Sequence, residues 1–156
     1  MKTALSDAYN FRQVDDRLCT AGQPTEEQLA SAARDGIRVV INLALHDDPR
    51  YSLADERASV EALGMSYVHI PVLFPAPAEA DLLAFFDAMD THGDKPILVH
   101  CAANYRVSAF LGLYRVIRKG WSRDEAFDVM RAVWEPNEVW ASFIETMLAS
   151  RGTEGA

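Results

Sequence analysis

The residues best suited to chemistry lie close together in the stretch LVHCAANYRVSAF, residues 98–110. Cys101 is a strong nucleophile as a thiolate. Arg106, five positions later, carries a planar fork of donors that matches two oxygens of a phosphate or a similar oxyanion. This pair predicts covalent attack by Cys101 on a substrate whose negative charge is held by Arg106.

The elements around this stretch explain how the pair would be positioned. Residues 95–101, KPILVHC, predict a buried strand, and a helix is expected to begin near Val107. In an open α/β sheet, ligands bind beyond the carboxyl ends of the strands, and the free N–H groups and dipole of a helix start favour anions and thiolates. We therefore expect the connecting loop to cradle an oxyanion. Its residues are Ala102, Ala103, Asn104, Tyr105 and Arg106.

Two neighbours are candidates for supporting roles. His100 is expected to fix the loop through its ring hydrogen bonds, and Ser108 to donate to the departing thiolate. Each has a plainer alternative, because a histidine on a strand is often a hydrogen-bonded core residue and a serine near a helix start often caps the backbone. For the whole set the alternative is a Cys101 that only ends a strand and an Arg106 in a surface ion pair. Residue types, spacing and position together favour the site.

The rest of the chain alternates apolar strands with helices. Strands are predicted at residues 18–21, 37–45, 65–72 and 95–101, and helices at 25–35, 53–63, 78–92, 107–119, 122–134 and 138–148. This alternation predicts an α/β fold with a central, mostly parallel sheet of about four to five strands, flanked by helices and followed by a C-terminal helical group. We expect one domain over residues 1–150 and a disordered tail at 151–156. Three tryptophans, Trp121, Trp134 and Trp140, are expected to pack these helices together rather than to line a cleft.

Composition excludes several classes of function. Fifteen Lys and Arg residues against twenty-three Asp and Glu give a net charge of −8, which disfavours nucleic acid and anionic membranes as partners. No run is long enough to span a bilayer, the first residues do not resemble a secretory signal, and two cysteines cannot form a disulfide framework, so we expect a cytoplasmic protein. The histidines show no metal-ligand spacing, so we expect no metal and no cofactor. Cys19 is expected to be a small core residue, with a role in resolving an oxidised Cys101 as the alternative.

At these residues the sequence resembles the cysteine-dependent phosphatases of the tyrosine and dual-specificity type, whose phosphate loop reads H-C-x5-R-[S/T]. The resemblance extends to CTAGQPTEEQLASAARDGIRVVINL and GMSYVHIPV, and covers roughly residues 11–119. Within this superfamily, the sequence is similar to a small bacterial branch that includes the phosphatase-like domain of beta-lactamase-hydrolase-like proteins. The resemblance implies hydrolysis of phosphate monoesters through a cysteinyl-phosphate. The substrate would be a phosphorylated small molecule or a phosphoprotein, with protein phosphotyrosine as one candidate.

The loop departs from the phosphatase pattern in length. Four residues separate Cys101 from Arg106, which resembles the C-x-x-G-x-R loop of rhodanese-type sulfurtransferases. Asn104 takes the place of the glycine there, and asparagine is among the few residues that enter the left-handed backbone region at low cost. A sulfurtransferase that carries a persulfide on Cys101 is therefore the main alternative. A catalytically silent module that binds phosphate through Arg106 is a further one.

This sequence also has no obvious counterpart to the general acid of the phosphatase family. That family carries an aspartate on the loop after the strand that matches YVHIPV, and here Leu73 stands near that position. Asp81 is our candidate, although the helix dipole would equally favour a solvated carboxylate there. The other candidates are Glu79, Asp47, Asp48 and Glu135.

Overall fold

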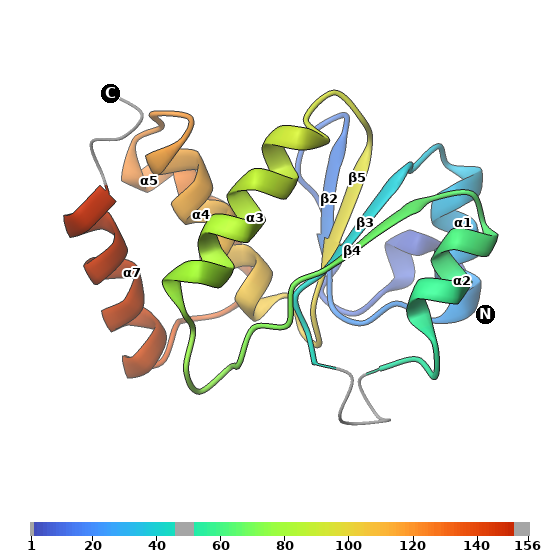
Figure 1. Ribbon diagram of the computed structural model, residues 1–156, viewed down its shortest axis with the longest axis horizontal. Coiled ribbons are helices and arrows are strands. Elements are labelled where there is room, and N and C mark those ends of the chain that lie inside the picture. The colour runs from blue at the N-terminus through green and yellow to red at the C-terminus, as the bar shows by residue number, and fades with distance from the viewer. Residues whose placement is uncertain (1, 46–51, 152–156) are drawn as a thin grey trace.

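A five-stranded sheet forms the centre of the computed structural model, which describes residues 2–45 and 52–151 (Figure 1). The strands lie in the order β1 (Arg12–Gln13), β2 (Leu18–Ala21), β5 (Ile97–His100), β3 (Val39–Asn42) and β4 (Ser66–His69). Only β1 runs antiparallel, against β2. The predicted mostly parallel sheet is confirmed. The prediction omitted β1 because two exposed residues are too few to produce an apolar pattern.

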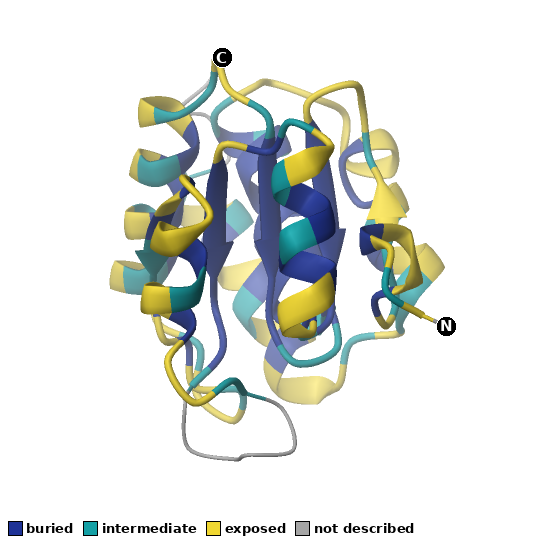
Figure 2. Ribbon diagram, turned by 90° about the vertical axis from the view of Figure 1, so that its right-hand side faces the viewer, coloured by how far each residue is buried: buried dark blue, intermediate teal, exposed yellow. Residues whose placement is uncertain are grey.

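Helices cover both faces of the sheet (Figure 1). The first face carries α1 (Glu26–Arg34), α2 (Glu56–Ala62) and the short 3-10 helix η1 (Leu5–Asp7). The second carries α3 (Glu79–Thr91), α4 (Tyr105–Ile117), α5 (Arg123–Ala126), α6 (Asp128–Val133) and α7 (Glu138–Arg151). Each face has its own apolar core, and the strands between them are buried along most of their length (Figure 2).

The central position of β5 follows from its residues. Every residue of β2, β3 and β5 is buried, as expected for parallel strands that helices cover on both sides. Ile97, the first residue of β5, pairs with Leu18 of β2 and with Val39 of β3. Cys101 therefore follows the carboxyl end of the middle strand of the sheet, where this class of fold builds its sites.

The helix boundaries agree with the sequence at some ends and differ at others. α1 begins with a capping box, in which Thr25 Oγ1 accepts from the N–H of Gln28 at 3.1 Å and the Gln28 side chain accepts from the N–H of Thr25 at 3.0 Å. The helix expected near Val107 begins at Tyr105. The single helix expected over residues 122–134 is two, α5 and α6, which meet at Phe127.

The C-terminal part of the chain ends on a helix. α7 extends to Arg151, whose Nε donates to Glu79 Oε2 at 2.6 Å. The rest of the tail that we predicted, residues 152–156, lies outside the described residues. Over the ranges that the structure describes, no helix combines the length and the apolar character needed to cross a membrane.

Candidate active site

The loop from Cys101 to Asn104 joins β5 to α4, and Asn104 fixes its turn. Asn104 has φ 70°, so the expected left-handed backbone conformation, in which asparagine takes the place of a glycine, is confirmed. Its side-chain Nδ2 donates to Thr20 Oγ1 and to the Asn10 carbonyl, both at 2.9 Å. These bonds tie the loop to β2 and to the segment before β1, which stabilises a conformation that most residues avoid.

The loop carbonyls are bound by the segments that surround them. The Ala102 carbonyl accepts from the N–H of Gln23 at 3.0 Å, and the Ala103 carbonyl accepts from Asn10 Nδ2 at 2.9 Å. Gly22 permits this close approach, because a Cβ at that position would lie 2.6 Å from the Ala102 carbonyl oxygen.

The loop N–H groups have no such partners. Among the residues that the structure describes, none accepts a hydrogen bond from the backbone N–H of Ala102, Ala103 or Tyr105. Backbone donors without a protein acceptor beside a helix start are suited to an anion.

Arg106 lies in the first turn of α4 and points into the protein. Its side chain is 9% exposed, its Nη1 donates to the Val72 carbonyl at 2.8 Å, and its Cζ lies 5.8 Å from the centre of the Phe74 ring. No carboxylate in the described ranges forms an ion pair with Arg106. The alternative of a surface ion pair is therefore excluded for the described residues. Arg106 directly follows the loop in the chain, and its guanidinium charge is available to bind an anionic oxygen.

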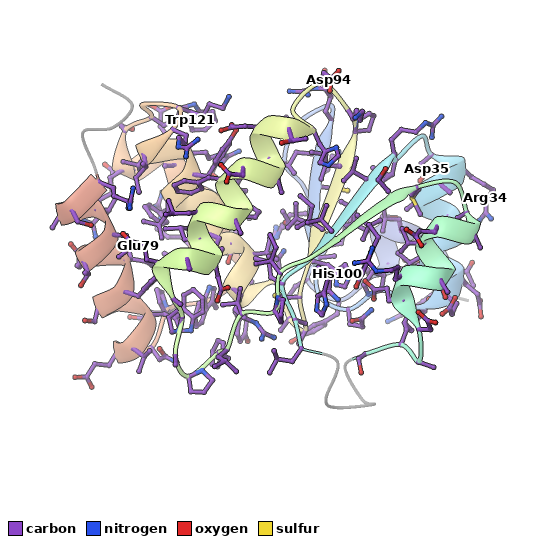
Figure 3. All side chains as sticks on the ribbon, viewed as in Figure 1. Arg34, Asp35, Glu79, Asp94, His100 and Trp121 are labelled. Atoms are coloured by element: carbon purple, nitrogen blue, oxygen red, sulfur yellow. The ribbon has the colours of Figure 1, made fainter. Side chains whose placement is uncertain are left out.

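A buried ion pair lies directly behind the loop. His100 Nε2 and Glu56 Oε2 are 2.6 Å apart, and both side chains are fully buried. On its other side the His100 ring places Nδ1 3.3 Å from the Cys101 carbonyl. Figure 3 shows His100 at the end of the sheet, on the side of α2. The expected link between His100 and the loop is therefore present, with Glu56 as its second partner.

The electrostatics of Glu56 follow from its neighbours. Burial acts to raise the pKa of this carboxyl, but the charge of His100 and hydrogen bonds from His100, Gln23 and Tyr67 lower the pKa to about 2. Gln23 Nε2 donates to Glu56 Oε1 at 2.7 Å. The sequence alone did not single out Glu56. The signal was an acidic residue in the first turn of a helix that starts at the carboxyl edge of the sheet, after the loop that follows β3.

Ser108 does not make the contact expected of it. Its hydroxyl donates to the Tyr105 carbonyl at 3.1 Å and accepts from Trp134 Nε1 at 3.2 Å, and it makes no hydrogen bond with Cys101. Donation from Ser108 to the departing thiolate therefore stays a prediction. Ser108 lies three residues after Tyr105 in α4, about one helical turn away, so the Tyr105 carbonyl is the acceptor nearest to its hydroxyl.

The tryptophans have two roles, of which we expected only one. Trp140 is fully buried and donates through Nε1 to the Phe74 carbonyl at 2.7 Å, so it packs helices as predicted. Trp134 is partly exposed and stacks on Tyr105 of the loop, with ring centres 4.6 Å apart and an interplanar angle of 7°. Phe74 lies 5.8 Å from the Trp134 ring. These three partly exposed rings, Phe74, Tyr105 and Trp134, form an aromatic wall beside Arg106.

The acid candidates lie in different environments. Asp81 is half-buried in the first turn of α3, this partial burial raises its pKa, and its carboxylate makes no described contact with Cys101 or Arg106. Glu79 is paired with Arg151, on the side of α7 (Figure 3). Glu135 is exposed in the turn between α6 and α7. Asp47 and Asp48 lie outside the described residues.

Cys19 lies on the opposite face of the sheet from Cys101. It belongs to the core under α1 and α2, whereas Cys101 belongs to the core under α3 and α4. Burial raises the pKa of the Cys19 thiol to about 12, and its Sγ donates to the Ile97 carbonyl at 3.7 Å. Cys19 therefore fits the predicted role of a small core residue, and the sheet separates it from Cys101.

The loop, the buried arginine at the helix start and the parallel sheet define a protein of the cysteine-phosphatase-like class. A family model described as the phosphatase-like domain of beta-lactamase hydrolase-like proteins matches residues 10–117. The chain belongs to this family, as the sequence resemblance predicted. Among the described residues, no group of three His, Cys, Asp or Glu side chains is arranged to hold a metal ion.

Individual relatives agree with this assignment. The chain is 33% identical to a beta-lactamase hydrolase-like protein of Xylella fastidiosa over 130 residues, which are 77% of this chain and 30% of that protein. It therefore spans about 30% of the length of that relative. A crystal structure of a candidate phosphatase from Shewanella putrefaciens CN-32 superposes with a TM-score of 0.83 at 33% identity, covering 95% of this chain and 97% of the other.

A more distant relative carries a dual-specificity name. The dual specificity protein phosphatase TpbA of Pseudomonas aeruginosa is 22% identical over 82% of this chain and 56% of its own. A structure of TpbA in complex with phosphotyrosine superposes with a TM-score of 0.68 at 17% identity, over 92% of this chain and 91% of that one. At this identity the likeness shows a shared fold.

Proposed function

We propose that this protein is a cysteine-dependent phosphatase that hydrolyses phosphate monoesters through a cysteinyl-phosphate. The single observation that carries the proposal is that no described residue accepts a hydrogen bond from the backbone N–H of Ala102, Ala103 or Tyr105, in a loop whose Ala102 and Ala103 carbonyls are bound by neighbouring segments. Such N–H groups bind the oxygens of a tetrahedral anion and do not require a residue to move when charge develops. Membership of a phosphatase-like family supports the same chemistry.

The reaction divides into two steps. In the first, the Cys101 thiolate attacks phosphorus, the S–P bond forms and the bond to the leaving oxygen breaks, while that oxygen takes a proton from a general acid. In the second, water attacks phosphorus, the S–P bond breaks, the acid takes a proton back and inorganic phosphate leaves. The loop N–H groups and Arg106 would hold the equatorial oxygens through both steps.

Asp81 is the acid that we propose. Its raised pKa suits a group that must be protonated before it can donate, and it has no ion-pair partner among the described residues. Glu79 is less suitable, because its Oε2 already accepts a hydrogen bond from Arg151 Nε at 2.6 Å.

The aromatic wall supports an aryl phosphate as substrate. The Phe74 ring lies 5.8 Å from the Arg106 guanidinium carbon, and Tyr105 and Trp134 extend the wall from it, so the ring of a phosphotyrosine would pack along this wall. Protein phosphotyrosine is therefore the substrate class we propose. A thiolate nucleophile requires reducing conditions, so the predicted cytoplasmic location remains part of this proposal.

Hydrolysis of 4-nitrophenyl phosphate between pH 5 and pH 8 tests the proposal, with wild type beside Cys101→Ser. We expect turnover in wild type and a loss of at least about 10³-fold in the variant. The variant should still bind phosphate, because the cradle is intact. Hydrolysis that is equal in both proteins would disprove the role of Cys101. Phosphate binding with no hydrolysis in either would identify the silent module instead.

A sulfurtransferase remains the second candidate because of the loop length. Four residues between Cys101 and Arg106 match the rhodanese-type loop rather than the phosphatase pattern. In that reaction Cys101 takes the outer sulfur of thiosulfate, sulfite leaves, and the persulfide passes its sulfur to a thiol or to cyanide. Mass spectrometry after incubation with thiosulfate tests it. A gain of one sulfur atom on Cys101 would support this candidate, and an unchanged mass would dispose of it.

A further inference from the structure

A cavity lies at the end of the sheet opposite to the loop. It has a volume of about 170 Å³, and its walls include Leu18 and Ile97, the first residues of β2 and β5. Both strands run from this cavity toward Cys101. Figure 3 shows the two ends, with Trp121 near one and His100 at the other. The cavity is therefore separate from the candidate active site.

Positive charge gathers around this cavity although the chain carries a net charge of −8. Four cationic side chains line it, and Asp15 is the one carboxylate among its described lining residues. Asp15 Oδ1 already accepts from the backbone N–H groups of Arg17 and Leu18, both at 2.8 Å. The cations are Arg17, Lys95, Arg115 and Lys119.

These cations differ in how far they are neutralised. Arg115 is 7% exposed and forms an ion pair with Asp128 at 3.0 Å. Within the described part of the chain, no carboxylate forms an ion pair with Arg17 or Lys119. Both side chains are exposed at the mouth of the cavity. They leave an excess of positive charge that an anionic ligand would neutralise.

Aromatic rings form one wall of the same cavity. Trp121 is 43% exposed, and the Arg115 guanidinium carbon lies 4.3 Å from the centre of its ring. The Lys119 ammonium lies 5.5 Å from the centre of the Tyr114 ring. The buried Arg115 packs against the Trp121 ring, so an exposed aromatic surface lines the same cavity as Arg17 and Lys119.

We propose that this cavity binds a small aromatic carboxylate. The cations Arg17 and Lys119 would bind the carboxylate, and the Trp121 ring and the apolar floor would bind the ring of the ligand. Pockets for drug-sized ligands run to roughly 300–1,000 Å³, so this smaller cavity suits a ligand with a single ring. The proposal does not depend on the reaction at Cys101.

Titration with phenylacetate tests the proposal, with binding followed by calorimetry and by amide and indole N–H signals in NMR. We expect saturable binding that shifts the Trp121 indole signal. Arg17→Gln and Lys119→Gln should each weaken binding about 5- to 10-fold, since each removes one charge-assisted contact. The neutral analogue 2-phenylethanol should bind at least about tenfold more weakly for the same reason.

Arg34→Gln is the matched control, because Arg34 is an exposed cation on α1, on the other face of the sheet. It should bind phenylacetate as wild type does. The proposal is overturned if binding does not saturate, or if Arg34→Gln weakens it as much as Arg17→Gln does. It is also overturned if excess inorganic phosphate competes with phenylacetate, because phenylacetate would then be bound at the loop beside Arg106 and not in the cavity. A change in hydrodynamic size that accompanies the signals would also overturn it, since it would assign the cavity to self-association.

Discussion

At the scale of single residues, the site divides into groups that neighbour each other in the chain and groups that only the fold brings together. His100, Cys101 and Arg106 were predictable, because seven consecutive residues contain all three. Glu56 and Asn10 were not, since they reach the loop from α2 and from the segment before β1. Their role depends on strand order, which short-range patterns do not encode.

The ion pair between Glu56 and His100 predicts a specific dependence of stability on pH. Because the pKa of Glu56 falls from its usual 4.5 to about 2 in the folded protein, its stabilising contribution is complete above pH 4.5 and is lost as the pH falls toward 2. Glu56→Gln should therefore remove this part of the acid sensitivity. At neutral pH it should also lower the free energy of unfolding by about 1–3 kcal/mol, because the buried His100 Nε2 loses the carboxylate oxygen that lies 2.6 Å from it.

Urea unfolding of wild type and Glu56→Gln between pH 2.5 and pH 7 measures both effects. The double variant Glu56→Gln/His100→Gln is the control, since it replaces the charged pair with two neutral amides. It should recover much of the stability that the single variant loses at neutral pH. Wild type and Glu56→Gln with parallel pH profiles would contradict the pair's role.

The proposed acid makes a second prediction at this scale. Asp81→Asn should lower kcat by about 10²-fold for an alkyl phosphate, whose leaving oxygen needs a proton, and less for 4-nitrophenyl phosphate. It should also remove the loss of activity at higher pH that deprotonation of the acid causes. Steady-state kinetics with the two substrates across pH measure this. Glu79→Gln is the matched control and should retain kcat, although it breaks the pair with Arg151. An unchanged Asp81→Asn profile would exclude Asp81 as the acid.

At the scale of helices and strands, the chain encodes most of the fold locally. Buried strands and capped helices were predictable because their apolar periods and caps are short-range features, as at Thr25. The start of α4 was not, because the loop delivers Tyr105 and Arg106 already in helical geometry once Asn104 has turned the backbone. The break between α5 and α6 at Phe127 was also missed. It reflects a contact with another helix, since the Phe127 ring packs where Gly112 of α4 has no side chain.

This contact gives an element-scale prediction for Gly112→Ala. Alanine in place of glycine inside a helix usually stabilises a protein by roughly 0.5–1 kcal/mol. Here the added Cβ would overlap the buried Phe127 ring. We therefore expect the free energy of unfolding to fall by about 1–3 kcal/mol, as overpacking does. Chemical denaturation measures the change. Gly112→Ala/Phe127→Leu makes room for the methyl group and should recover part of the loss, whereas a more stable Gly112→Ala would refute the contact.

At the scale of the whole molecule, the C-terminal helices complete a site that the family match does not fully contain. That match ends at residue 117, yet Trp134 and Trp140 contact the loop residue Tyr105 and the Phe74 segment. The sequence placed these tryptophans in helices but did not connect them to the loop, because the connection runs through packing between α4, α6 and α7. The acidic chain also places four cationic side chains around one cavity at the opposite end of the sheet. The two ends therefore suit different ligands.

A chain shortened to end at Trp121 tests whether the C-terminal helices are part of one cooperative unit. The cut removes five large buried apolar side chains, and at about 2 kcal/mol each the loss is roughly 10 kcal/mol, comparable to the whole stability of a domain. These are Phe127, Met130, Trp140, Ile144 and Met147. We expect the shortened chain to show no cooperative thermal transition and no turnover of 4-nitrophenyl phosphate.

Trp140→Phe in the full chain is the control. It keeps the ring but loses the bond to the Phe74 carbonyl, so it should cost only about 1 kcal/mol. A shortened chain that unfolds at the wild-type midpoint would show instead that residues up to 121 carry the fold and the reaction without α5, α6 and α7.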